Sequence, residues 1–243
     1  MARPKPSDRI HSLIEAAVRV FAQKGFRRTQ MADIAAEMGV SPGLLYSYVE
    51  SKEALFYLVL DQDGGPPASL PAPTPAPGAI ADRVAERFGE DGSLPALVGA
   101  LAQPRADDPA AQLETIVRQL YGVIYRSARL ITILDRSALD MPELAAVFHD
   151  HIRGGLVERL SRLIETRMAT GQYRRAAHPA VAARLIIETV TWFACHRRGD
   201  PASQDIDDEA AEDTTVDFIV SSLVHPTAPP VGAGHPKTSS KQT

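Results

Sequence analysis

The chain has 243 residues, of which 44% are hydrophobic and one is cysteine, and its formal net charge is −4. A single cysteine excludes an internal disulfide framework and is typical of a reducing compartment. No apolar run approaches the roughly 18 residues of a membrane-spanning helix, and the basic N-terminus lacks the apolar stretch of a secretory signal, so we expect a soluble cytoplasmic protein.

The first 62 residues predict four helices. The first covers about 8–24, with Ser7 as its cap, an apolar stripe that repeats every three to four residues, and Gly25 at its end. The next two, at 31–38 and 42–48, are joined by Met38-Gly39-Val40, where Gly39 accepts a positive φ cheaply. The fourth covers about 52–62. A short helix, a glycine-centred turn and a capped second helix are typical of a helix-turn-helix that reads DNA.

A proline- and glycine-rich stretch, 63–78, cannot form a helix and predicts an extended, partly disordered loop that serves as a spacer. Beyond it the apolar spacing is helical throughout, and no strand alternation is present. The predicted helices of this part are 80–88, 94–102, 109–138, 142–170, 179–197 and 207–224. We expect an all-α fold with a helix-turn-helix DNA-binding domain at 1–55, a helical regulatory and dimerisation domain at 56–225 and a disordered tail at 226–243.

Residues 25–55 resemble the N-terminal segment of the tetracycline-repressor-type (TetR) family of transcriptional regulators. The matching positions are Gly25, Phe26, Thr29, Met31, Asp33, Ile34, Ala35, Gly39, Val40, Ser41, Gly43, Leu45, Tyr46, Tyr48, Ser51, Lys52, Glu53 and Leu55. The departures are Gln30, Met38, Pro42, Leu44 and Val49, and Val49 replaces an aromatic residue of the family pattern. The resemblance implies binding of double-stranded operator DNA, a small-molecule effector and a homodimer.

The predicted DNA contacts divide into two kinds. The resemblance implies that Tyr46 and Lys52 reach phosphate oxygens, although a half-buried core position is the alternative for Tyr46. Arg27 and Arg28, before the second helix, are further phosphate candidates. Base contacts are expected from the third helix, whose candidates are Pro42, Gly43, Leu44, Ser47 and Tyr48. Thr29 and Ser41, which are candidate helix caps, complete the predicted DNA-binding residues. This helix has no Arg or Asn, so bidentate reading of guanine or adenine is absent from it.

The distribution of charge agrees with DNA contact at the N-terminal end. Residues 1–55 carry eight Lys and Arg against six Asp and Glu, whereas the other 188 residues carry 18 against 24. The positive field therefore lies over the residues that are predicted to contact DNA phosphates. The net negative charge of the other residues disfavours contact between the body and DNA.

The helical body offers candidates for an effector pocket and a dimer interface. The pocket candidates are Leu120, Tyr121, Ile124, Tyr125, Ile131, His149 and Trp192. They suit a mostly apolar or aromatic molecule, but ordinary core packing explains the same stripe. The dimer candidates are two stripes, one of Leu185, Ile186, Thr189, Val190 and Phe193 and one of Val216, Ile219, Val220 and Leu223. The alternative is that both stripes complete the core of one chain.

We find no sequence support for an enzyme, a metal site or a cofactor. His149-Asp150-His151 has suitable ligand types, but residues i and i+2 of a helix point to different sides and cannot share one ion. The sequence favours a repressor that an effector releases from its operator; a constitutive regulator or an activator without effector is the alternative.

Overall fold

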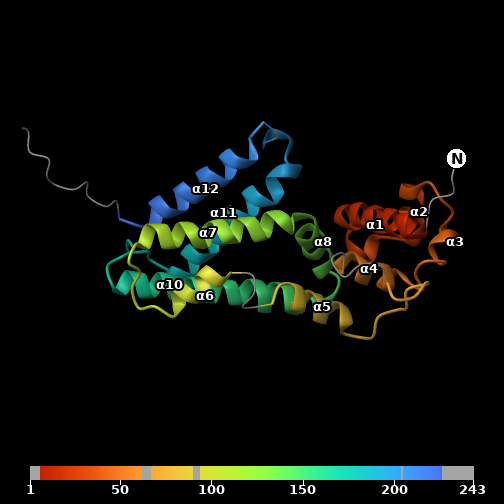
Figure 1. The fold of residues 1–243 in the computed structure, drawn as a ribbon, viewed down its shortest axis with the longest axis horizontal. Helices are drawn as coiled ribbons and strands as arrows, with labels where there is room; N and C mark the ends of the chain where they lie inside the picture. Colours follow the sequence, from red (N-terminus) through yellow and green to blue (C-terminus); the bar gives the residue numbers. More distant parts are fainter. Residues whose placement is uncertain (1–5, 62–66, 90–93, 204, 226–243) are drawn as a thin grey trace, which may run out of the picture.

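The computed structural model describes residues 6–61, 67–89, 94–203 and 205–225, with side chains from residue 9 onward. The all-α prediction is confirmed: helices dominate the described residues, which otherwise contain two isolated β-bridges. The molecule is elongated, with the N-terminal helices at one end and the body at the other (Figure 1). The predicted tail, 226–243, lies outside the described residues.

The N-terminal domain consists of α1 (Pro6–Arg28), α2 (Met31–Met38), α3 (Pro42–Leu45) and α4 (Lys52–Leu60). Its core contains Leu13, Phe21, Ile34, Leu45 and Phe56, each at most 1% exposed. The ring of Phe56 meets those of Phe21 and Phe26 edge-on, with ring centres 5.0 Å apart in both pairs. Such aromatic packing adds to the free energy gained by burial.

Gly25 interrupts α1 and forms the contact with the body. Its φ of 73° is unfavourable for residues with a Cβ, and an added Cβ would lie 3.0 Å from the carbonyl oxygen of Arg136. The next residue, Phe26, donates its backbone N–H to Ser137 Oγ at 3.1 Å. Glycine is therefore needed here both for the backbone angle and for the close approach of the body.

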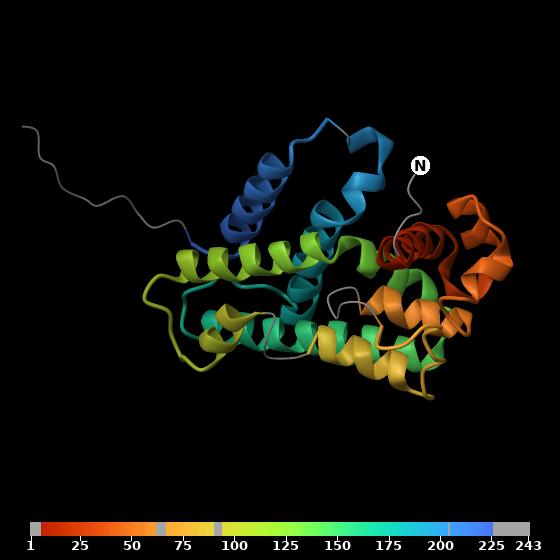
Figure 2. The same cartoon turned by 45° about the vertical axis from the view of Figure 1, so that its right-hand side comes forward.

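The body contains the remaining helical segments. They are α5 (Ala79–Arg87), α6 (Pro95–Leu101), α7 (Pro109–Arg126), α8 (Ala128–Ala138), α9 (Pro142–Ala145), the π-helix η1 (Ala146–Arg153), α10 (Gly154–Ala169), α11 (Pro179–Ala194), the 3₁₀ turns η2 (His196–Gly199) and η3 (Pro201–Ser203), and α12 (Asp208–Leu223). Helix α11 crosses between α7 and α10, and α12 covers α7 and α11 (Figure 2). Helix α8 packs along α1 and so joins the body to the N-terminal domain.

Three predicted helices differ from those observed. The helix predicted at 109–138 breaks at Ser127, whose φ and ψ of −97° and 8° are not helical, because α8 must change direction to lay its apolar face on α1. The helix predicted at 142–170 contains the π-helical segment η1. The helix predicted at 42–48 ends at Leu45, where the N–H groups of Ser47 and Tyr48 bond three residues back and tighten the last turn.

The proline-rich loop is not a loose spacer in its described part, residues 67–78, which we name the proline strap. Ala72 is 3% exposed and donates its N–H to the Tyr48 carbonyl at 2.7 Å, while the N–H of Glu50 donates to the Ala72 carbonyl at 2.9 Å. The N–H of Thr74 donates to Glu50 Oε2 at 2.9 Å. The bridge also covers Val49, which is fully buried although it is smaller than the aromatic residue of the TetR pattern.

Candidate nucleic-acid interface and ligand cavity

The turn between α2 and α3 has the geometry that the sequence predicts. Gly39 lies in the left-handed region, with φ 68° and ψ 33°, and its N–H bonds to the Ala36 carbonyl. Nothing lies within 4 Å of a Cβ added to Gly39, so the backbone angle alone requires glycine there. Ser41 precedes α3 in an extended conformation and Pro42 occupies the first helical position. This turn sets α3 across the end of α2.

An exposed surface surrounds the start of α3, and we name it the α3 surface. Ser41, Pro42, Gly43 and Ser47 are exposed, and Tyr46 has 51% of its surface accessible. Tyr46 is not among the side chains in the core or packed against it, which disfavours the alternative of a core position. Leu44 and Tyr48 are only partly exposed, on the flank of the same surface. Figure 1 shows α3 at the end of the molecule farthest from the body, where a duplex can approach without meeting it.

Thr29 and Lys52 do not face this surface. The side chain of Thr29 is buried, and its hydroxyl donates to the Gly25 carbonyl at 2.7 Å. Lys52 Nζ donates to the carbonyls of Phe26 and Thr29, both at 2.9 Å, and lies 4.4 Å from the centre of the Phe26 ring. The prediction that both residues contact DNA is thus corrected. They hold the turn between α1 and α2, because two backbone carbonyls and the Phe26 ring surround the Lys52 ammonium.

Arg27 and Arg28 extend from the end of α1 and are exposed. Arg27 lies 3.7 Å from Asp140 of the body, and Arg28 donates its Nε to the Lys24 carbonyl at 3.0 Å. Asp33 joins this region to the start of α2 because it accepts from the Gln30 N–H at 2.9 Å and pairs with Lys24 at 2.8 Å. Those bonds, from Lys24 and then from Gln30, lower the pKa of Asp33.

A mostly apolar cavity of about 100 Å³ lies in the body, and we name it the body cavity. Its lining includes the predicted pocket residues Leu120, Ile124 and Ile131. The other lining residues are Phe88, Gly89, Leu94, Val123, Asp135, Phe148, Ile152, Arg153, Leu156, Arg159, Ile187 and Thr191. The side chains of the π-helix that reach it are spaced at i, i+4 and i+5, as one face of a widened helix requires.

The other pocket candidates lie outside the body cavity. Tyr121 is 1% exposed and donates to the Phe193 carbonyl at 3.4 Å, and Tyr125, whose ring stacks on that of Tyr121, donates to Asp208 at 2.7 Å. His149 packs against the Phe148 ring, and Trp192 is 39% exposed on the outer face of α11. The assignment of these four residues to the pocket is corrected, because the break at Ser127 and the π-helix change which faces point inward.

Polar groups in the body cavity were not anticipated from the sequence. Arg153 donates to both carboxylate oxygens of Glu188, at 2.7 and 2.9 Å, and lies 3.8 Å from Asp135. Burial raises the pKa of the Asp135 carboxyl, and the neighbouring Arg153 only partly opposes that rise. Arg159 forms no ion pair within the described part of the chain. Helical periodicity gave no signal for these residues, which look like solvated charges in sequence.

Residues 13–58 match the family model described as bacterial regulatory proteins, tetR family. The predicted resemblance to the TetR family is thereby confirmed for the N-terminal domain, and that family is one of transcriptional regulators.

Curated relatives match over the same region. The uncharacterized HTH-type transcriptional regulator YuxN of Bacillus subtilis is 45% identical over 49 residues, which are 20% of this chain and 17% of the relative. The HTH-type transcriptional regulator HbdR of Aromatoleum sp. is 38% identical over 53 residues, or 22% of this chain and 23% of the relative. The matches therefore span less than a quarter of these relatives.

Solved structures match over nearly the whole chain. The ketosteroid transcriptional regulator KstR2 of Mycobacterium tuberculosis is 16% identical, with a TM-score of 0.58, over 91% of this chain and 97% of that one. AibR, solved in complex with isovaleryl coenzyme A and operator DNA, is 19% identical, with a TM-score of 0.51, over 86% of this chain and 97% of that one. At sequence identities this low, the similarity to these structures shows a shared fold and nothing more.

Five of the nine predicted dimer residues belong to the core of the single chain. Ile186, Val190, Val216, Ile219 and Leu223 are buried between α11, α12 and α7, so their assignment to an interface is corrected. The outward face of the same two helices is nevertheless apolar. Its exposed members are Val181 at 56%, Leu185 at 63%, Trp192 at 39% and Phe218 at 66%, and its partly exposed members are Thr189, Phe193 and Val220. We name this set the α11–α12 face.

Within the described ranges, no group of three or more His, Cys, Asp or Glu residues could hold a metal ion. No helix in those ranges is both long enough and apolar enough to span a bilayer.

Proposed function

We propose that this chain is a sequence-specific DNA-binding repressor, in which the N-terminal domain, through the end of α4, binds DNA and the body regulates and dimerises. The boundary predicted between residues 55 and 56 moves to the end of α4, because Phe56 packs on Phe21 and Phe26 in the core of the N-terminal domain. The observation that carries the proposal is the exposed α3 surface at the outer end of the molecule, which follows the Gly39 turn between α2 and α3. Tyr46 and Arg28 would contact phosphates, and Ser47 with Gly43 would meet base edges. Because α3 has only four residues, we expect a single protomer to contact few bases.

We infer that two copies bind a pseudo-palindromic operator. The α11–α12 face supports this inference, because large apolar side chains that are half or more exposed usually mark an interaction surface. A two-fold interface at this face would present two α3 surfaces on one side of the dimer. Each half-site would then be read by one copy.

We infer further that a mostly apolar effector binds in the body cavity and releases the DNA. The cavity, at about 100 Å³, is smaller than the roughly 150 Å³ that accepts a benzene ring, so any larger molecule must displace its walls. One wall is α8, which packs on α1. A ligand that favours the displaced arrangement shifts the population away from the DNA-bound spacing. Because AibR was solved with isovaleryl coenzyme A, acyl thioesters belong among the compounds to be tested.

Footprinting of the promoter upstream of the chain's own gene tests the DNA-binding proposal. We expect a protected pseudo-palindrome for the native chain, weaker protection for Tyr46→Phe, and an altered preference between operator variants for Ser47→Ala. Equal, unspecific affinity for every promoter fragment would contradict sequence-specific repression.

Calorimetric titration of a stabilising ligand, with and without operator DNA, tests the effector proposal. Linkage requires operator DNA to weaken ligand binding by the factor by which the ligand weakens DNA binding. Equal ligand affinity in both titrations would favour the alternative of a constitutive regulator without an effector.

A further inference from the structure

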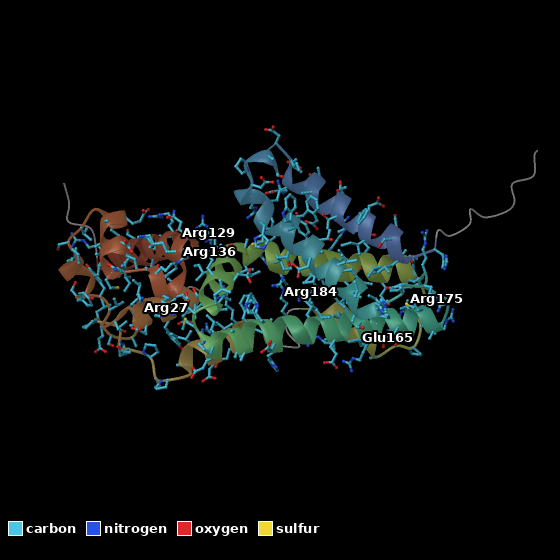
Figure 3. All side chains as sticks on the ribbon, turned by 180° about the vertical axis from the view of Figure 1, so that it is seen from behind. Arg27, Arg129, Arg136, Glu165, Arg175 and Arg184 are labelled. Carbon is cyan, nitrogen blue, oxygen red and sulfur yellow. The ribbon has the colours of Figure 1, made fainter. Side chains whose placement is uncertain are left out.

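A second cavity, of about 170 Å³, lies where the N-terminal domain meets the body, and we name it the junction cavity. Val18 of α1 and Val59 of α4 contribute its wall on the domain side. The body contributes Arg87, Tyr125, Arg126, Ser127, Ala128, Arg129, Leu130, Ile133 and Arg198. Arg129 lies beside α1 at this junction (Figure 3).

Four of the residues that line the junction cavity are arginines, and none of those residues is acidic. Arg198 lies 3.5 Å from Asp208, a carboxylate that also accepts from Arg197 and Tyr125. Arg129 lies 3.4 Å from Glu15, but its side chain is 79% exposed, so solvent screens this pair. Nearby carboxylates therefore offset only part of the positive charge.

Arg126 adds to this charge, because it forms no ion pair within the described part of the chain. Arg87 also lines the cavity and donates to the Leu60 carbonyl at 3.5 Å. Guanidinium groups gathered around one cavity repel one another, and a bound anion would turn that repulsion into attraction.

The break in the helix at Ser127 places the end of α7 and the start of α8 at the cavity. Helix α8 begins at the cavity, and Ala128, Arg129 and Leu130 of its first turn line it. The first N–H groups of a helix have no partner within that helix, and they carry the positive end of its dipole. The Ser127 side chain does not cap them. The guanidinium groups therefore lie around a cavity that the first turn of α8 also lines.

We propose that the junction cavity is a binding site for a phosphate-class oxyanion, either inorganic phosphate or the terminal phosphoryl group of an organic ligand. Guanidinium groups match the oxygens of such anions with paired hydrogen bonds. The cavity exceeds the roughly 150 Å³ that accepts benzene, so a tetrahedral oxyanion fits. Duplex DNA is not the ligand, because the α3 surface lies at the far end of the N-terminal domain (Figure 1).

Calorimetry of the full chain with inorganic phosphate, at an ionic strength held constant with chloride, tests this proposal without DNA. We expect saturable binding of one phosphate per chain. The double variant Arg126→Gln, Arg129→Gln should bind phosphate at least about tenfold more weakly, since each lost charged hydrogen bond weakens binding by about that factor. Arg162→Gln is the matched control, because Arg162 is exposed on α10 and does not line the cavity. It should bind like the native chain.

Absence of saturable binding to the native chain, or equal affinity in the double variant, would overturn the proposal. Each single variant is measured as well, so that a folding defect in the double variant cannot decide the result. A parallel titration with ADP identifies the source of the anion. Tighter binding of ADP, in competition with phosphate, assigns the site to an organic phosphoryl ligand, and binding of phosphate alone assigns it to the free ion.

Discussion

Lys52 places its charged group on backbone carbonyls rather than toward solvent. We expect Lys52→Ala to lower the free energy of unfolding by about 1–3 kcal/mol, because the carbonyls of Phe26 and Thr29 lose a charged donor. Urea denaturation measures this change. Arg28→Ala, at an exposed position, should leave stability within about 0.5 kcal/mol and reduce the slope of log affinity against log salt by about one. Unchanged stability and a reduced slope for Lys52→Ala would instead assign Lys52 to a phosphate.

Asp135 makes stability depend on pH in the direction opposite to a paired surface carboxylate. Its pKa in the unfolded chain is about 3.9, and burial raises the pKa in the folded chain. The folded state therefore holds more protons between the two pKa values, and stability falls as pH rises through that window. Asp135→Asn should give a flatter profile of unfolding free energy from about pH 4 upward.

Denaturation at a series of pH values measures this effect of Asp135. The exposed Asp107 provides the control, and Asp107→Asn should keep the native profile. If Asp135→Asn and the native chain have parallel profiles, Arg153 compensates the carboxylate fully.

At the scale of elements, the proline strap is bound to the segment that follows α3. We expect Ala72→Pro to destabilise the N-terminal domain by about 1–3 kcal/mol, because it removes the N–H that donates to Tyr48 and leaves a buried carbonyl without that donor. Hydrogen exchange of the Glu50 amide, which donates to Ala72, reports the loss locally. The control is Ala76→Pro, at an exposed position of the same strap. Equal protection of the Glu50 amide from exchange in the native chain and both variants would mean that the proline strap does not stabilise the N-terminal domain.

The sequence predicted the helix-turn-helix well because its determinants are local. Gly39 and Pro42 specify their backbone angles, and the apolar spacing of α2 specifies its buried face. It did not predict the strap, since prolines indicate an extended chain without indicating what that chain pairs with. Nor did it predict the break at Ser127, which depends on how α8 packs against α1. The same distant packing explains why Tyr121 and Trp192 were assigned to the pocket in error.

At the scale of the whole molecule, the three proposed sites lie one after another along its long axis (Figure 1). The α3 surface is at one end, the junction cavity lies between the domains, and the body cavity is enclosed by the body helices. Helix α8 lines both cavities and packs on α1. Any displacement of α8 by a ligand therefore reaches the N-terminal domain directly, through the close contact of Gly25 with Arg136.

The α11–α12 face provides the test of assembly. Leu185 and Phe218 are more than 60% exposed in one chain, so replacing them by glutamate costs little in folding but introduces like charges into a two-fold interface. We expect Leu185→Glu, Phe218→Glu to sediment as a monomer at a concentration where the native chain is a dimer. Leu139→Glu is the control, because Leu139 is 84% exposed on the segment after α8, and it should remain a dimer.

Loss of the dimer should also weaken operator binding. Two linked α3 surfaces bind with an avidity that exceeds single-site affinity by about 10²–10⁴. The double glutamate variant should therefore lose about that factor in affinity for a full operator, measured by fluorescence anisotropy, and much less for an isolated half-site. A variant that stays dimeric would move the interface away from α11 and α12. A monomeric variant with native operator affinity would keep the interface but separate it from DNA recognition.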